Sequence, residues 1–136
     1  MDTIRKLDYF SMETPHKIGE GARLLGALRD AGVNLVAFTG FPSGRRAQVD
    51  FIPADTAQFK DAARKLKLKI GPRKTVFLAQ GDDRPGAIAE ICEKLANAGI
   101  NMIAMDAVAV DNGRYGAIFW VEPRGVNKAA KVLGAG

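Results

Sequence analysis

Hydrophobic and polar positions along the chain repeat with the periods of strands and helices. In the first half, leucines recur at helical spacing up to Gly32, which predicts a helix that ends there. Apolar and polar residues alternate up to Pro53, which predicts a strand that ends there. The elements predicted there are strand 8–12, helix 18–32, strand 33–41, strand 45–53, helix 55–68 (with Asp55 or Thr56 as N-cap) and a short strand 66–70. Their order is βαββαβ.

The second half repeats this pattern. Residues 16–37 align with residues 83–104 at a shift of 67 without a gap. The identical positions are Gly19/Gly86, Ala22/Ala89, Leu28/Leu95, Ala31/Ala98, Gly32/Gly99, Asn34/Asn101 and Ala37/Ala104. The elements predicted in the second half are strand 74–80, helix 85–99, strand 101–110, strand 114–122 and helix 126–133. We therefore predict two units of one design, residues 1–71 and 72–136.

The second unit is expected to lack its last strand. An Asp-Asn-Gly turn at 111–113 predicts a tight hairpin, because Asn and Gly tolerate positive φ angles. Pro53 aligns with Pro123 once this longer hairpin is counted, so a strand matching 67–70 would need residues 137–140. The strand must be absent or borrowed, and an open sheet edge has to be covered.

The order βαββαβ predicts an α+β fold of the ferredoxin-like type, an antiparallel sheet with two helices on one face. The other face is apolar in the second unit. In strand 114–121, Tyr115 and Phe119 point to one side and Ile118 and Trp120 to the other. Strands that are apolar on both sides are buried on both sides, so we expect another sheet or a second chain to cover this face.

Composition and charge narrow the class of protein. The 136 residues carry a net charge of +5, but the basic residues are spread along the chain, which is typical of a solvated surface. The N-terminus has no apolar signal region, and no apolar run reaches the ~18 residues of a membrane span. The single cysteine cannot form an internal disulfide. We expect a cytoplasmic protein with no membrane or nucleic-acid partner.

Candidate chemistry for an enzyme is sparse. Cys92 lies at an apolar helical position and is expected in the core, and with one histidine a zinc cluster has too few ligands. No phosphate-binding GxxxxGK[ST] loop occurs, and RYGAIFWV does not match the RNA-binding octamer. Asp82 and Asp83 are adjacent and suit helix capping better than catalysis. We expect no catalytic residues, no metal and no cofactor.

Binding of a small ligand fits the sequence better. The start of each first helix carries a glycine, and free N–H groups at a helix N-terminus attract a carboxylate. Asn34 and Asn101 begin the next strand in each unit, and we expect them to lie beside that helix N-terminus. A turn-forming role alone would also explain these asparagines.

The stretch DDRPGAIAEICEKLANAGINMIAM resembles the ACT domain, a ligand-binding regulatory module of amino-acid metabolism. The likeness covers residues 73–133 clearly and residues 3–70 more weakly, where Lys17-Ile18-Gly19 replaces the Arg-Pro-Gly turn. The resemblance implies ligand contacts at the first loop and second strand of each unit. The implied residues are Asp82, Asp83, Arg84, Pro85, Gly86, Ala87 and Asn101 in the second unit, and Pro15, His16, Lys17, Ile18, Gly19 and Asn34 in the first.

The resemblance implies a non-enzymatic sensor made of two ACT units. It would bind an amino acid or similar small molecule at a unit or subunit interface, form a homodimer and regulate a separate enzyme. Two other functions stay open: a protein-interaction module with an apolar face and no ligand, and a hydrolase of the same fold like acylphosphatase, whose Arg and Asn loop is not evident here.

Overall fold

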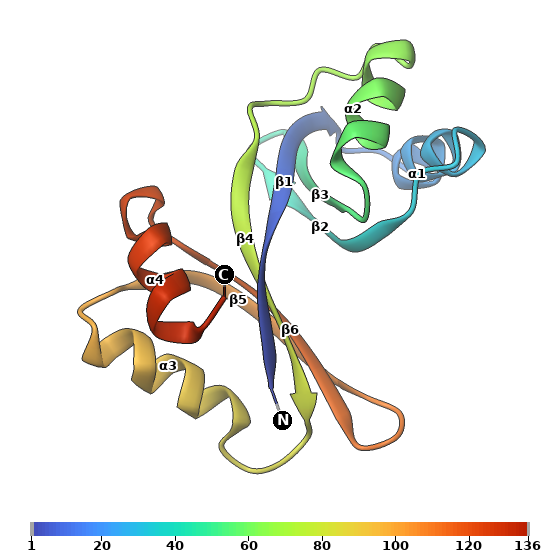
Figure 1. Cartoon of the computed structure of the whole chain (residues 1–136). Helices are drawn as coiled ribbons and strands as arrows, with labels where there is room; N and C mark the ends of the chain where they lie inside the picture. Colours follow the sequence, from blue (N-terminus) through green and yellow to red (C-terminus); the bar gives the residue numbers. More distant parts are fainter. Residues whose placement is uncertain (1, 136) are drawn as a thin grey trace. The chain divides into compact units, whose positions relative to one another are not determined.

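The computed structural model describes residues 2–135 of the chain, which form two compact units. We call residues 8–74 the N-terminal unit, and residues 2–7 together with 75–135 the C-terminal unit. These units differ from the predicted ranges 1–71 and 72–136 mainly at the N-terminus, where the first residues group with the C-terminal unit. The elements are labelled in Figure 1.

Six strands and four α-helices follow one another in the predicted order. They are β1 (Thr3–Pro15), α1 (Glu20–Asp30), β2 (Leu35–Ser43), β3 (Arg46–Pro53), α2 (Thr56–Lys65), β4 (Lys74–Asp82), α3 (Ala87–Asn97), β5 (Met102–Val110), β6 (Arg114–Val121) and α4 (Val126–Leu133), with a 3-10 turn Pro123–Gly125 before α4. The predicted α+β, ferredoxin-like class is confirmed.

In the N-terminal unit the strands lie in the order β2-β3-β1, all antiparallel. Helices α1 and α2 bury Leu24, Leu28 and Phe59 against the sheet. The rings of Phe10 and Phe59 stack with centroids 5.2 Å apart. Asp55 is the N-cap of α2, as predicted: its carboxylate accepts a hydrogen bond from the Gln58 amide at 3.0 Å.

The predicted strand 66–70 is wrong, because residues 66–73 form no strand. Lys67 adopts a positive φ of 58°, which interrupts an extended segment. Leu68 and Ile70 still pack against the core, and the Gly71 amide donates to the Ser11 carbonyl at 2.8 Å. The segment therefore follows β1 by side-chain packing, without a regular ladder of hydrogen bonds.

In the C-terminal unit the strands lie in the order β4-β6-β5, and the first part of β1 lies on the other side of β4. The described residues after α4 contain no strand, as predicted. Residues 3–7 of β1 take the position of that missing strand, and Ile4 packs against the core of this unit. The borrowed strand protects an edge that would otherwise be open.

The core of the C-terminal unit is built from helix-facing residues of β4 and β6. Phe77 and Phe119 stack with centroids 5.3 Å apart beneath α3 and α4. Ile118 and Trp120, on the opposite face of β6, are buried as well, so this strand is covered on both sides as its sequence predicts.

Cys92 is exposed, which corrects the expectation that it lies in the core. On α3 the buried residues are Ala87, Ile91 and Leu95, at a spacing of four. Cys92 follows Ile91 by one position, about 100° around the helix, and so turns towards solvent.

Candidate functional site

Each unit has a hollow at the N-terminus of its first helix. The N-terminal hollow has a volume of about 270 Å³ and is lined by the end of β1, the start of α1 and the β2–β3 hairpin. The C-terminal hollow, of about 400 Å³, is lined by the loop after β4, the start of α3, the end of β5 and Tyr115. The two hollows occupy equivalent places in the repeat.

Both helices begin in the same way. Gly19 precedes α1 with φ 88° and Gly86 precedes α3 with φ 83°, a left-handed conformation that glycine adopts without strain. Neither helix has a side-chain cap, so the expectation that Asp82 or Asp83 caps α3 is wrong. The amides of Glu20 and Ala87 donate to the carbonyls of Lys17 and Arg84. The next N–H groups of each helix carry the positive end of the helix dipole towards its hollow.

The predicted residues of the N-terminal unit separate into two groups. Pro15, His16 and Lys17 line the N-terminal hollow, and Gly19 sets the direction of α1 beside it. Ile18 points to solvent with 103% of its surface exposed. It is available to a partner molecule rather than to the hollow of its own unit.

The predicted residues of the C-terminal unit are distributed similarly. Asp83, Arg84, Gly86 and Ala87 line the C-terminal hollow. Asp82 is the last residue of β4, where its carboxylate accepts a hydrogen bond from Arg114 Nη1 at 3.0 Å. Asp82 and Pro85 do not line this hollow.

Asn101 and Asn34 do not lie beside the helix N-terminus, which corrects the expected placement. Each follows the C-terminal end of the first helix, and the strand it precedes starts at that end. Asn101 lines a separate hollow of about 370 Å³ with Glu122 and Arg124. The helix runs antiparallel to the strands that flank it, so the end of β5, not its start, approaches the N-terminus of α3. The carbonyl of Asn34 accepts from the Ala54 amide at 3.0 Å, as a turn residue does.

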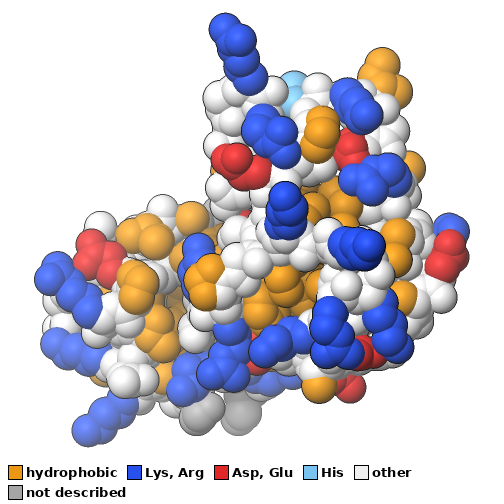
Figure 2. Space-filling view, turned by 90° about the horizontal axis from the view of Figure 1, so that it is seen from above, with side chains coloured by type: hydrophobic (Ala, Val, Ile, Leu, Met, Phe, Trp, Pro, Cys, Tyr) orange, Lys and Arg blue, Asp and Glu red, His pale blue; other side chains and the backbone are white. Residues whose placement is uncertain are grey.

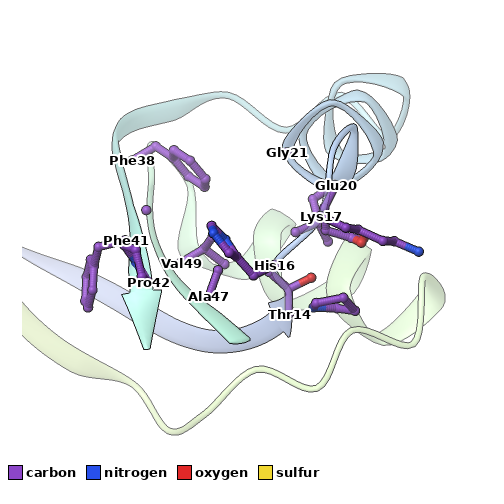
Figure 3. A pocket seen from close by; sticks show the side chains of 13 residues that line it. Thr14, His16, Lys17, Glu20, Gly21, Phe38, Phe41, Pro42, Ala47 and Val49 are labelled. Atoms are coloured by element: carbon purple, nitrogen blue, oxygen red, sulfur yellow. The ribbon is translucent and has the colours of Figure 1, made fainter. Parts of the chain in front are cut away.

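The N-terminal hollow contains two buried polar side chains. Glu20, in the first turn of α1, has only 5% of its surface exposed and is paired with Arg23. Thr14 is 4% exposed, and its hydroxyl has no hydrogen-bond partner among the described residues. Figure 3 shows Glu20 at the start of α1, Thr14 at the end of β1, and the rings of His16 and Phe38 pointing into the hollow.

The C-terminal hollow has a different charge arrangement. Arg84 Nη2 donates to Glu90 at 2.7 Å and lies 3.7 Å from Asp2. The guanidinium of Arg84 lowers the pKa of Glu90 by hydrogen bonding and by its charge. Burial raises the pKa of Tyr115, and the nearby carboxylate of Asp2 raises it further. This hollow presents a cation that its neighbours already neutralise.

A cross-strand pair near the start of the first helix differs between the two units. Thr14 lies opposite Ala47 on β1 and β3, and Gly81 lies opposite Tyr115 on β4 and β6. Strand register makes these the equivalent positions of the two units. It also corrects the alignment of Pro53 with Pro123, because Pro53 lies opposite Leu35 as Val121 lies opposite Met102. A Cβ at Gly81 would be 2.9 Å from the Tyr115 ring, so the ring fills the space that a side chain needs. In the N-terminal unit the small Ala47 leaves that space free.

Sequence reasoning did not find Thr14, Glu20 or Tyr115. The alignment at a shift of 67 contained a signal, because Glu20 falls on Ala87 and Arg23 on Glu90, which changes the charge at both places. The pairing of Thr14 with Ala47 could not be found in the same way, since it depends on the register of two strands.

The loop residues predicted to contact a ligand gather at the two hollows. Among residues 2–135, no group of three or more His, Cys, Asp or Glu side chains could hold a metal ion. No helix in the described part of the chain is long and apolar enough to cross a membrane. Figure 2 shows basic side chains scattered over the visible face between acidic and apolar ones. The two hollows are therefore the leading candidate sites.

Comparison with solved structures supports the fold. A protein from Bacteroides thetaiotaomicron aligns with TM-score 0.77 and 19% identity over 98% of this chain and 88% of its own. The ligand-free regulatory subunit of aspartate kinase from Thermus thermophilus aligns with TM-score 0.63 and 18% identity over 98% and 94%. Aspartokinase alpha and beta subunits align with TM-score 0.60 and 18% identity over 97% and 93%.

No protein-family model matches the chain, and no curated protein matches its sequence. The structural likeness is nevertheless to regulatory subunits along nearly their whole length. The fold predicted from the resemblance to the ACT domain is confirmed: the chain has two repeats of the order βαββα and shares the fold of a regulatory subunit of aspartate kinase.

Proposed function

We propose that this protein is a non-enzymatic regulatory sensor that binds an amino acid at the hollows beside α1 and α3. The observation that carries the proposal is the repeated construction. In both units a positive-φ glycine leads into an uncapped helix whose N-terminus borders a hollow. Regulatory subunits of aspartate kinase share this fold, which supports a regulatory role.

An amino acid carries both charges that such a site would recognise. Its carboxylate would accept hydrogen bonds from the free N–H groups at the start of the helix, where the dipole favours a negative charge. Its ammonium group needs an acceptor or a carboxylate nearby, and both hollows have acidic side chains in their surroundings. A neutral or purely apolar ligand would use neither feature.

Regulation would follow from differential affinity. A ligand shifts an equilibrium between two arrangements only when it binds one of them more tightly. We propose that a second subunit contributes to the bound state, because the resemblance implies ligand sites at unit or subunit interfaces. The strand β5 supports a homodimer: it is the last strand in the order β4-β6-β5 and exposes Ile103, Val108 and Val110. The signal would pass to a separate enzyme in the cytoplasm.

Thermal unfolding of the purified protein against the twenty L-amino acids tests this function. A ligand that binds only the folded state raises the melting temperature increasingly as its concentration exceeds Kd. We expect a rise with one or a few L-amino acids and none with the matching D-enantiomers. A folded protein that responds to none of them would contradict the proposal.

The exposed apolar residues of β5 favour one alternative, a protein-interaction module without a ligand. Such a module would dimerise or capture a partner while its melting temperature stays independent of amino acids. Sedimentation together with the thermal series separates the two functions, since only the sensor responds to a small molecule.

A further inference from the structure

The N-terminal hollow contains a buried hydroxyl that nothing in its surroundings satisfies. Thr14 continues the row of β1 residues that faces the helices, after Phe10 and Met12, which are apolar and buried. A threonine in this row is 4% exposed, and its Oγ1 has no hydrogen-bond partner among the described residues. An unsatisfied buried hydroxyl is unfavourable, so a donor that reaches Oγ1 through a small shift of the lining would gain a hydrogen bond.

A buried carboxylate borders the same hollow. Glu20 is 5% exposed, whereas its ion-pair partner Arg23 is 61% exposed and contacts only the oxygen Oε1. In the described structure this leaves Oε2 to accept a hydrogen bond from another donor. Leu24, Phe38 and Val49 complete the lining with apolar surface. A carboxylate, a hydroxyl and an apolar wall together fit an ammonium group on an aliphatic stem.

The C-terminal hollow differs in one of these features, because it has no buried carboxylate: its lining carboxylate Asp83 is exposed. The hydroxyl of Tyr115 is buried there without a hydrogen-bond partner among the described residues, as Thr14 Oγ1 is in the N-terminal hollow. Gly81 replaces Thr14 and Ala87 replaces Glu20, and the ring of Tyr115 occupies the space beside Gly81. Each hollow has a cation in the loop before its helix, Lys17 in the N-terminal unit and Arg84 in the C-terminal unit. Arg84 is paired with Glu90 and Asp2. The two hollows therefore differ in chemistry although they share a backbone design.

We propose that the N-terminal hollow is the ammonium-recognising site of the protein, with Glu20 Oε2 and Thr14 Oγ1 as acceptors, and that the C-terminal hollow does not recognise ammonium groups. The inference rests on the proposed function, because it assigns the ammonium end of the amino-acid ligand to one unit. It assigns the ammonium contact to the unit with the weaker likeness to the ACT domain, where Lys17-Ile18-Gly19 replaces the Arg-Pro-Gly turn.

The n-butylammonium ion is a suitable probe, with butyrate as the matched anion. Each is titrated into the full-length, ¹⁵N-labelled protein, and the amide shifts are followed by NMR. We expect saturable shifts with n-butylammonium at Thr14, Glu20 and Gly21, and none at Ala87 or Ile88. Equal shifts in both hollows, or shifts that do not saturate, would reduce the effect to surface electrostatics and overturn the proposal.

Three substitutions test the named groups. Glu20→Gln keeps the shape and removes the charge, and we expect affinity for n-butylammonium to fall roughly 10- to 100-fold. Thr14→Val keeps the shape and removes the hydroxyl, so binding should weaken several-fold while the unliganded protein melts no lower than wild type. Ala47→Tyr places an aromatic ring at the position that Tyr115 occupies in the C-terminal unit. The ring should fill the hollow, and binding should be lost.

Glu90→Gln is the control, because it removes one acid from the first helix of the other unit and should leave n-butylammonium binding unchanged. Unchanged binding in both Glu20→Gln and Thr14→Val would overturn the proposal even if Ala47→Tyr does not fold.

The outcomes separate this inference from the proposed function. An amino acid that raises the melting temperature equally in wild type and Glu20→Gln would refute the ammonium site and leave the sensor function standing. Saturable n-butylammonium binding at Glu20 with no response to any amino acid would support the ammonium site and refute the sensor function.

Discussion

Substitution of Gly81 by alanine tests the packing that distinguishes the two hollows. The added Cβ would lie 2.9 Å from Tyr115 Cε1, closer than a carbon contact allows, and would also contact Asp2 Oδ1. The Asp2 carboxylate is the end of a flexible side chain and can rotate away. The Tyr115 ring is 5% exposed and has to shift within the core. Overpacking of this kind costs about 1–3 kcal/mol.

A double-mutant cycle isolates this contact. Tyr115→Ala alone removes a buried ring and should cost about 3–5 kcal/mol, as for other large-to-small substitutions. With the ring absent, the alanine at position 81 meets no obstacle in the core. The double variant should therefore be more stable than the sum of the single effects predicts, by a coupling energy of about 1–3 kcal/mol.

Denaturant unfolding measures these free energies. Trp120, the single tryptophan, is buried in the C-terminal unit and reports unfolding of that unit by its fluorescence. Ala47→Gly, at the equivalent place in the other unit, is a control that should leave the Trp120 transition unchanged. Strict additivity of Gly81→Ala and Tyr115→Ala, or a Gly81→Ala protein as stable as wild type, would refute the proposed ring contact.

Three further outcomes are expected. Asp55→Ala should lower the free energy of unfolding by about 1 kcal/mol, because the Gln58 amide loses its hydrogen-bond acceptor at the N-cap. Asp55→Asn keeps a side-chain oxygen there and should be nearly as stable as wild type. Gly86→Ala should cost about 1–2 kcal/mol in a chemical-denaturation assay because of the φ of 83°, and no loss would contradict the left-handed turn. Tyr9 and Tyr115 should both titrate above 10.0, since burial raises both pKa values. Burial favours the neutral phenols in the folded protein. The free energy of unfolding is therefore highest below the pKa of the unfolded state, and it falls as pH rises through the pKa of the folded state. Phenolate absorbance of wild type and Tyr115→Phe checks this, and a normal pKa in either protein would contradict it.

The local elements could be predicted because their causes are local. Apolar residues recur at the spacing of four that places Ile91 and Leu95 on one face of α3, and Asp55 stands where a helix begins. The same signals recur at a shift of 67 residues, and this recurrence predicts two similar units. The ferredoxin-like class follows from the order of the elements.

The candidate site could be predicted only in part. The loops that precede α1 and α3 were identified from their glycines, and the residues Lys17 and Arg84 in these loops do line the hollows. The predicted placement of Asn101 is wrong because it ignores the direction of the elements. Helix α3 runs antiparallel to β5, so the start of β5 lies at the C-terminal end of α3 and not at its N-terminus.

Periodicity and turn residues act over a few positions. The amino-acid sequence therefore predicts the helices, their duplication, the strands that form and the missing last strand of the second unit, although it also predicts a strand 66–70 that does not form. The identity of the borrowed segment, residues 3–7 of β1, and the pairs that face each other across the sheet depend on the folded chain. The pairs Thr14–Ala47 and Gly81–Tyr115 are more than 30 residues apart in sequence, and strand register alone brings each together. Register follows from the pattern of buried positions across the sheet, and it places Ala47 opposite Thr14 in one unit and the Tyr115 ring opposite Gly81 in the other.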